Sequence, residues 1–402
     1  MAHPTEAYLR PRIEEIAVYG CALTYSTGLM MGLLLIPFYG EHFQFSAITL
    51  GILVGFAGLF LTLLRIPAGF LVDRFGSRIV VITAVIAQLL SAPFLLMAHT
   101  DWTSPIVALG LAQLLAGSSR AAFWPAKQAF LVDWPHQTSS WRFGRLSASD
   151  SIAQIAGPAL VGLVANAFGL FAASLTFLVV SLLAVAFSLM LPRLESAEQG
   201  AEVPANRPLA SLKVVATSGP VYLGALAAFS AGIPMIAFGS FAPLFLFSVG
   251  YSATAVGLLV SVRGLAMVVF STIYVRLFDS GEYRSPWFWS MSALTLGFAA
   301  VPLFTGALPL SLAIALIGLG AGVVQVLSMV VVGDLAPRSH VGMAMAYSGL
   351  YRSVSVFITP LVLGVAVEYW GLASSFWILA AVFLVGASMS GPIVAKTVGD
   401  RR

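Results

Sequence analysis

Ten residues, Gly69-Phe70-Leu71-Val72-Asp73-Arg74-Phe75-Gly76-Ser77-Arg78, lie between two long apolar segments of the chain. The segment before the turn, 53–72, contains one charged residue, Arg65, and the segment after it, 79–98, contains none. Each segment is long enough to cross a hydrocarbon core of roughly 30 Å as a helix. The stretch therefore predicts a short polar turn between two antiparallel membrane-spanning helices.

The composition of the whole chain predicts a polytopic membrane protein. Of its 402 residues, 59% are hydrophobic and 9% are charged, and the mean hydropathy is +0.96. Soluble domains carry about 25% charged residues. The single cysteine, Cys21, excludes an internal disulfide and a cysteine-based metal site. We expect no enzyme activity, no cofactor and no metal site, because the histidines are scattered over different loops: His3, His42, His99, His136 and His340.

Apolar runs predict twelve membrane-spanning helices. Their residue ranges are 16–39, 47–72, 79–99, 104–131, 144–165, 169–191, 218–247, 253–277, 286–305, 308–332, 342–366 and 370–394. Between the sixth and seventh spans, residues 192–217 are rich in Glu, Ser, Pro and Asn and have no apolar period. We therefore predict a six-helix bundle at 1–191, a cytoplasmic linker at 192–217 and a second six-helix bundle at 218–402.

The two halves of the chain resemble each other in sequence. The run 45–53 (FSAITLGIL) recurs as 251–259 (YSATAVGLL), which is an offset of 206 residues. At that offset Asp73 corresponds to Asp279, and at an offset of 202 Pro158 corresponds to Pro360. Such a parallel duplication places the binding site of a transporter at the interface of the repeats.

The basic residues indicate the orientation of the chain. Sixteen of the 20 Lys and Arg lie at one set of span ends, four lie inside spans, and the opposite loops contain none. The positive-inside rule then predicts that both termini are cytoplasmic in a multi-pass protein of the plasma (inner) membrane. The pI near 9.3 follows from this topology, so we expect the lipid bilayer and not nucleic acid as a partner.

The pattern G-x-L-x-D-R-x-G-x-R at 69–78 resembles the loop signature of the major facilitator superfamily, except that Ser77 replaces a basic residue. The resemblance implies an all-α membrane protein with twelve transmembrane helices in two pseudo-symmetric six-helix bundles, expected to be a monomer. It also implies a reversible cytoplasmic latch between the halves. The residues of this predicted latch are Gly69, Asp73, Arg74, Gly76 and Arg78, with Asp133 as their partner.

A second pattern lies in the fifth span. Ala153-x-x-x-Gly157-Pro158-x-x-Val161-Gly162 is similar to the antiporter signature of bacterial drug and metabolite exporters, with two glycines replaced. Gly157 would allow close helix approach and Pro158 a helix bend. An ordinary packing kink is the alternative. Many drug/proton antiporters carry an acid in the first span, and here 16–39 has none.

Polar residues inside spans are the candidates for substrate binding or coupling, because a buried charge costs about 2.5–3.5 kcal/mol on the insertion scale. They are Gln113, Arg120, Trp124, Asp150, Gln154, Arg263 and Arg352. Asp150 is the only carboxylate well inside a span, so we expect it to carry the proton if transport is proton-coupled. The alternative is that Asp150 is a structural counter-ion of Arg120 or Arg65.

The sequence thus predicts a secondary active transporter that moves a small organic solute by alternating access, as an antiporter for proton-coupled efflux. The alternative is an organic-anion carrier, driven by proton symport or by exchange, in which Arg120, Arg263 and Arg352 hold the anion.

Overall fold

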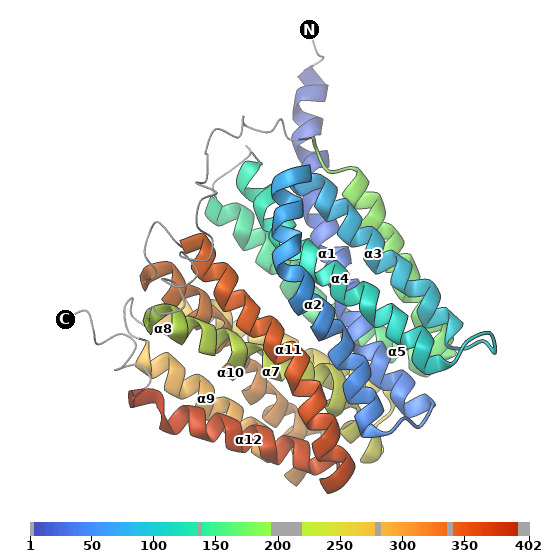
Figure 1. The fold of residues 1–402 in the computed structure, drawn as a ribbon, viewed down its shortest axis with the longest axis vertical. Coiled ribbons are helices and arrows are strands. Elements are labelled where there is room, and N and C mark those ends of the chain that lie inside the picture. The colour runs from blue at the N-terminus through green and yellow to red at the C-terminus, as the bar shows by residue number, and fades with distance from the viewer. Residues whose placement is uncertain (1–3, 135–138, 194–218, 278–282, 336–340, 393–402) are drawn as a thin grey trace. The chain divides into compact units, whose positions relative to one another are not determined.

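The computed structural model describes residues 4–134, 139–193, 219–277, 283–335 and 341–392. This described part is almost entirely α-helical and contains no β-strand (Figure 1). Its helices are α1 (Pro4–His42), α2 (Ala47–Phe75), α3 (Ser77–Met97), α4 (Pro105–Asp133), α5 (Ser139–Leu189), α7 (Gly219–Ser248), α8 (Ala253–Leu277), α9 (Arg284–Ala300), α10 (Ala307–Leu335), α11 (Val341–Trp370) and α12 (Leu372–Ser388), with a short 3-10 turn, η1 (Val301–Leu303), after α9.

The long helix α5 contains two spans. Its backbone turns at Gly169, where φ is 85° and ψ is 171°, a conformation that a residue with a Cβ rarely adopts. Among the described residues nine helices are long and apolar enough to cross a membrane, and α9 and α12 are shorter. With α5 counted twice, these make the twelve predicted spans, and the predicted fold is confirmed.

Helix boundaries differ from the apolar runs at the two ends of the chain. Helix α1 begins at Pro4, twelve residues before the predicted span at 16–39. The apolar run marks only the part suited to lipid, whereas a helix continues into water as long as its backbone hydrogen bonds are satisfied. Helix α12 ends at Ser388.

The chain forms two compact units. The first unit comprises residues 1–44, 56–200 and 252–257, and the second comprises 45–55, 201–251 and 258–402. In the first unit α1 packs mainly on α5, and α3 on α4. In the second, α7 packs on α10 and α11, and α9 on α10 and α12. The predicted boundary between two bundles stays a prediction, because most of 192–217 lies outside the described residues.

Each unit contains the same helix contact, built on glycine. In the first unit a Cβ added to Gly257 would collide with the carbonyl oxygen of Pro158. In the second unit a Cβ added to Gly51 would collide with the carbonyl oxygen of Pro360. Only glycine allows the two backbones to approach this closely. The two glycines are 206 residues apart and the two prolines 202, so the repeat in the sequence is also a repeat of helix packing.

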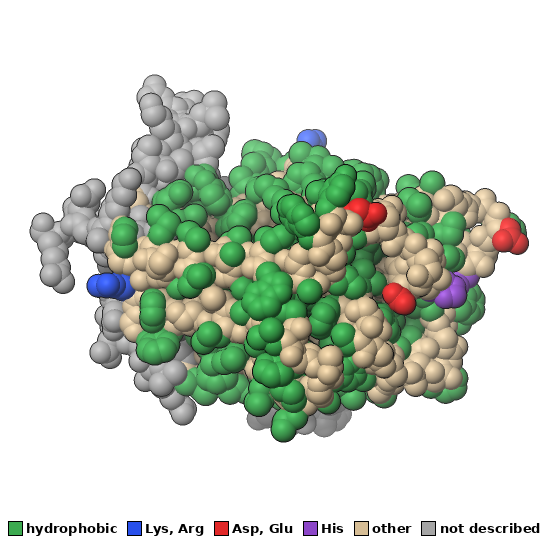
Figure 2. All heavy atoms as spheres, turned by 90° about the horizontal axis from the view of Figure 1, so that it is seen from below, with side chains coloured by type: hydrophobic (Ala, Val, Ile, Leu, Met, Phe, Trp, Pro, Cys, Tyr) green, Lys and Arg blue, Asp and Glu red, His purple; other side chains and the backbone are tan. Residues whose placement is uncertain are grey.

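The surface of the protein is largely apolar, as expected where a protein contacts lipid. Hydrophobic side chains are spread over the face drawn in Figure 2, and only a few charged side chains interrupt them. On α2, for example, Leu63, Ile66 and Phe70 are all more than half exposed. An unpartnered apolar surface of this kind indicates an integral, multi-pass membrane protein.

Candidate functional site

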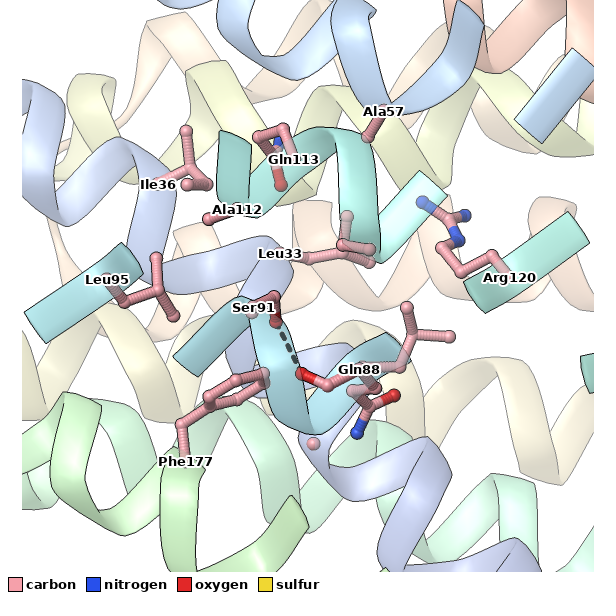
Figure 3. Close-up of a pocket in the computed structure, with 14 residues that line it drawn as sticks. Leu33, Ile36, Ala57, Gln88, Ser91, Leu95, Ala112, Gln113, Arg120 and Phe177 are labelled. Carbon is pink, nitrogen blue, oxygen red and sulfur yellow. Dashed lines mark hydrogen bonds between the residues drawn. The ribbon is translucent and has the colours of Figure 1, made fainter. Parts of the chain in front are cut away.

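A small cavity lies inside the first unit (Figure 3). Its walls come from α1, α3, α4, the second half of α5 and Ala57 of α2, and its volume is about 30 Å³. A single water needs roughly 10–15 Å³ by this measure, so there is room for about two. Most of the lining is apolar, and the polar side chains in it are Gln88, Ser91, Gln113 and Arg120.

Gln88 reaches the cavity because a glycine faces it. A Cβ on Gly28 of α1 would collide with the Gln88 side-chain nitrogen, so any other residue at 28 would displace the amide. The Gln88 Nε2 donates to the carbonyl of Tyr25 at 3.3 Å, and the Ser91 hydroxyl donates to the Gln88 carbonyl at 2.6 Å. Sequence reasoning missed both residues, although two polar residues three positions apart in the otherwise apolar run 84–98 were the available signal.

Arg120 supplies the charge in this cavity. Its side chain is only 7% exposed, and among the described residues none hydrogen-bonds or ion-pairs with its guanidinium. It is therefore not joined to Asp150, which was one of the two partners considered for that carboxylate. The neighbouring hydroxyls are already engaged, since Ser119 donates to the Ala84 carbonyl at 2.6 Å and Tyr25 donates to Ser119 at 2.9 Å.

Gln113, Arg120 and Lys127 follow one another at seven-residue intervals, so they share one face of α4, and this face divides between the cavity and the packed interior. Gln113 and Arg120 line the cavity. Further along, Lys127 is fully buried, and its ammonium donates to the carbonyl of Val18 on α1 at 2.7 Å. Trp124 is partly buried against a hydrophobic cluster that includes Val18 and Phe123. This face of α4 thus lines the cavity at one end and contacts α1 at the other.

The remaining candidate residues lie on three other helices. On α5, Asp150 is half-buried and Gln154 is 8% exposed, one turn away. On α8 of the second unit, Arg263 is 4% exposed, with its guanidinium 6.0 Å from the ring of Phe238 and 3.9 Å from the sulfur of Met267. On α11, Arg352 is half-buried. Arg263 thus lies against helix α7 of its own unit, away from the exposed surface.

Gly157, the glycine of the antiporter-like signature, lies at the contact between α5 and α1. A Cβ there would lie 2.6 Å from the Met30 Cβ and 2.9 Å from the Thr27 carbonyl oxygen. Pro158 lies inside α5, and the non-helical backbone angles found in that helix are at Gly169. The structure thus shows the close approach. A bend at Pro158 stays a prediction.

The residues of the predicted latch have separate surroundings. Arg78 donates from Nε to the Leu191 carbonyl at 2.8 Å and from a terminal nitrogen to the Leu189 carbonyl at 3.1 Å. It thus caps the C-terminal end of α5, where helix carbonyls lack partners. Asp73 and Arg74 are exposed, and Gly76 has a φ of 83° at the turn. Asp133 ends α4, and its side chain lies outside the described residues.

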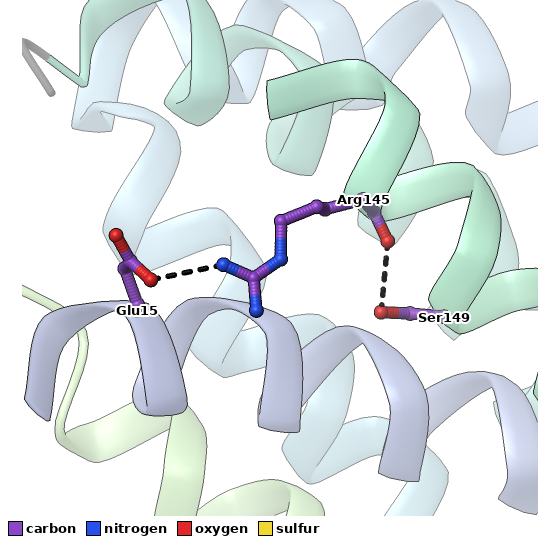
Figure 4. Close-up of polar contacts among 3 residues, drawn as sticks. All are labelled: Glu15, Arg145 and Ser149. Atoms are coloured by element: carbon purple, nitrogen blue, oxygen red, sulfur yellow. Dashed lines mark hydrogen bonds and ion pairs between the residues drawn. The ribbon is translucent and has the colours of Figure 1, made fainter. Parts of the chain in front are cut away.

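Two further arginines, both on α5, bond to other helices of the same unit. Arg145 forms an ion pair with Glu15 at 2.9 Å, and its own carbonyl accepts a hydrogen bond from Ser149 (Figure 4). Its guanidinium also lies 4.7 Å from the centre of the Tyr19 ring. Arg142 donates to the carbonyls of Leu131, Val132 and Trp134, which end α4. Arg78 and Arg142 therefore cap helix ends, whereas Arg145 joins α5 to side chains of α1.

The family model described as Major Facilitator Superfamily matches residues 18–307 and 225–396. The chain belongs to this superfamily. Its members are transporters and not enzymes, which agrees with the absence of enzyme activity expected from the sequence.

Solved structures of transporters share the fold. A mutant of the nucleoside transporter NupG has a TM-score of 0.77 at 15% identity, with 94% of this chain and 99% of that chain covered. The D-xylose-proton symporter has a TM-score of 0.72 at 15% identity, covering 95% and 97%. A bacterial homolog of the human lysosomal transporter Spinster has a TM-score of 0.72 at 14% identity, covering 100% and 99%. At these identities the likeness concerns the fold alone.

One curated relative is a Na(+), Li(+), K(+)/H(+) antiporter of Planococcus maritimus. It is 29% identical over 126 residues, which are 30% of this chain and 30% of the antiporter. The match therefore spans less than a third of the length of that relative.

Proposed function

We propose that this member of the superfamily is a secondary active antiporter of the plasma membrane that exports a small organic solute in exchange for protons, with both termini cytoplasmic. The observation that carries the proposal is Asp150, a half-buried carboxylate on α5 one turn from the buried amide of Gln154. A carboxylate in partial desolvation can bind and release a proton during a cycle. The proton antiporter among the relatives supports the exchange of protons.

The test is proton-driven flux in proteoliposomes. Asp150→Asn should abolish solute accumulation against a gradient while retaining solute exchange, because the asparagine can no longer bind the proton but keeps the shape of the side chain. Asp150→Glu should retain part of the accumulation. The matched control is Asp101→Asn, the same change at an exposed acid between α3 and α4, which should leave accumulation intact. Full accumulation by Asp150→Asn would exclude Asp150 as the proton carrier.

A second candidate is an organic-anion carrier, and the burial of Arg263 favours it. The Nε of Arg263 is buried without a hydrogen-bond partner among the described residues. An unmatched buried cation is costly, and an anionic solute would offset the cost. In the same liposomes, pH-driven uptake of a carboxylate that Arg263→Gln abolishes would favour this carrier. Export of neutral or cationic solutes would favour the exporter.

A further inference from the structure

The cavity of the first unit has an uncompensated positive charge. Its lining residues all belong to the described part of the chain, and Arg120 is the charged one among them, with no Asp or Glu. Arg120 is 7% exposed and has no anionic partner among the described residues, so its charge is costly to bury. An anion in the cavity would offset this cost.

The lining also offers a neutral donor. A glutamine amide has two N–H groups, and Gln88 needs only one of them for the Tyr25 carbonyl. The other can donate to a guest in the cavity. The nearby hydroxyls of Tyr25 and Ser119 already donate to other acceptors. The free N–H of Gln88 therefore adds a neutral donor to the charged donors of Arg120.

The size and polarity of the cavity select the kind of anion. A volume of about 30 Å³ is far below the roughly 300–1,000 Å³ of sites for organic ligands. Much of the wall is apolar, from residues such as Leu29, Leu33 and Phe177. Such a wall replaces little of the hydration of an ion, which penalises strongly hydrated, multivalent anions such as sulfate.

We propose that this cavity binds a single halide ion, chloride in the cell, as the counter-ion of Arg120. The ion stabilises the first unit by pairing a charge that the described residues leave unpaired. The proposal does not rest on the proposed function, because its test measures halide binding and not transport.

The test is thermal unfolding of purified full-length protein in detergent. Sodium gluconate is replaced stepwise by sodium chloride or bromide at constant ionic strength. Since the halide binds only the folded protein, the unfolding temperature should rise by a few degrees and saturate. Sulfate should give no saturable rise. An unfolding temperature that does not depend on halide would overturn the proposal.

Variants locate the effect. Arg120→Gln should lose the halide-dependent rise, and in gluconate it should unfold at a temperature no lower than wild type, because the variant lacks the unpaired charge. Lys127→Gln is the matched control, because it removes another buried cation of α4 that does not line the cavity, and it should keep the rise. A rise that persists in Arg120→Gln, or that disappears in both variants, contradicts the site.

A direct measurement covers the case in which Arg120→Gln does not fold. Wild-type crystals grown in bromide should show anomalous difference density beside the Arg120 guanidinium. Density at that place supports the proposal. A cavity without bromide density in such crystals overturns it.

Discussion

Tyr39 joins several polar groups at one end of the first unit. Its hydroxyl donates to the Leu95 carbonyl at 2.6 Å and lies 3.0 Å from the His99 Nε2 and 2.7 Å from the Ser174 hydroxyl. Because Tyr39 donates its hydroxyl proton to the Leu95 carbonyl, the Nε2 of His99 must itself donate a proton to the Tyr39 oxygen. Burial lowers the pKa of His99 from its ordinary value of 6.5, and the nearby His42 lowers the pKa further.

This cluster predicts a pH-dependent stability. The pKa of folded His99 is below that of the unfolded chain, so its contribution is complete above the ordinary value of 6.5 and is lost as pH falls through the folded pKa. We expect the unfolding temperature to fall as pH drops below 6.5. His99→Gln should make this fall shallower.

The groups that face His99 provide the control. They are Tyr39 and His42 of α1 and Phe171 of α5. His42→Gln removes one neighbouring charge, so it should weaken the pH dependence without abolishing it. Identical pH profiles of the unfolding temperature in wild type and His99→Gln would show that His99 does not cause the fall.

Helix packing in this protein depends on small residues, because lipid gives apolar helices little hydrophobic reason to associate. The contact of α1 with α5 at Gly157 and the contacts of Gly51 and Gly257 all place backbone against backbone. The repeated positions of Gly51 and Gly257 show that each compact unit contains the same contact.

At the α1–α5 contact we predict that Gly157→Ala is destabilising. The new methyl group would lie 2.6 Å from the Met30 Cβ and 2.9 Å from a backbone oxygen, so the helices must separate. Such overpacking costs about 1–3 kcal/mol. The unfolding temperature in detergent measures the loss.

Gly144 of the same helix is the matched control, because no atom lies within 4 Å of a Cβ built there. Gly144→Ala should be neutral or should stabilise by about 0.4–1 kcal/mol through the unfolded chain. Equal unfolding temperatures for the two variants would mean that the contact at Gly157 tolerates a methyl group.

Transport by a protein of this superfamily requires the whole molecule to change conformation, and the predicted latch at 69–78 belongs to this scale. Arg78 is engaged by helix carbonyls in the structure, whereas Asp73 is exposed. Asp73 is therefore the latch residue whose replacement disturbs the packing of its own unit least.

We predict that Asp73→Asn shifts the population toward the state open at the cytoplasmic mouth. A cysteine placed at the exposed Ser147 should then react several-fold faster with a membrane-impermeant thiol reagent applied from the cytoplasmic side. The native Cys21 is fully buried and contributes no background. Asp101→Asn, at an exposed acid between α3 and α4, should leave the labelling rate unchanged. An unchanged rate in Asp73→Asn would rule out the latch.

The sequence by itself determined the spans, the repeat and the family. A bilayer requires about 20 apolar residues per helix, so composition along the chain reveals each span without knowledge of its neighbours. The break within α5 followed from the same rule, because the predicted spans 144–165 and 169–191 meet at the turn of Gly169. The repeat is visible in the sequence as recurring residues, and in the structure as the two equivalent contacts of Gly51 and Gly257.

Only the tertiary structure decided what each polar residue faces. Helical periodicity placed Gln113, Arg120 and Lys127 on one side of α4. Periodicity does not show that Lys127 bonds to a carbonyl of α1 while Arg120 lines a cavity. Nor does it show that Gly28 leaves space for the Gln88 side chain. Periodicity is a property of one helix, whereas a cavity or an ion pair requires atoms from several helices whose register the linear sequence does not contain.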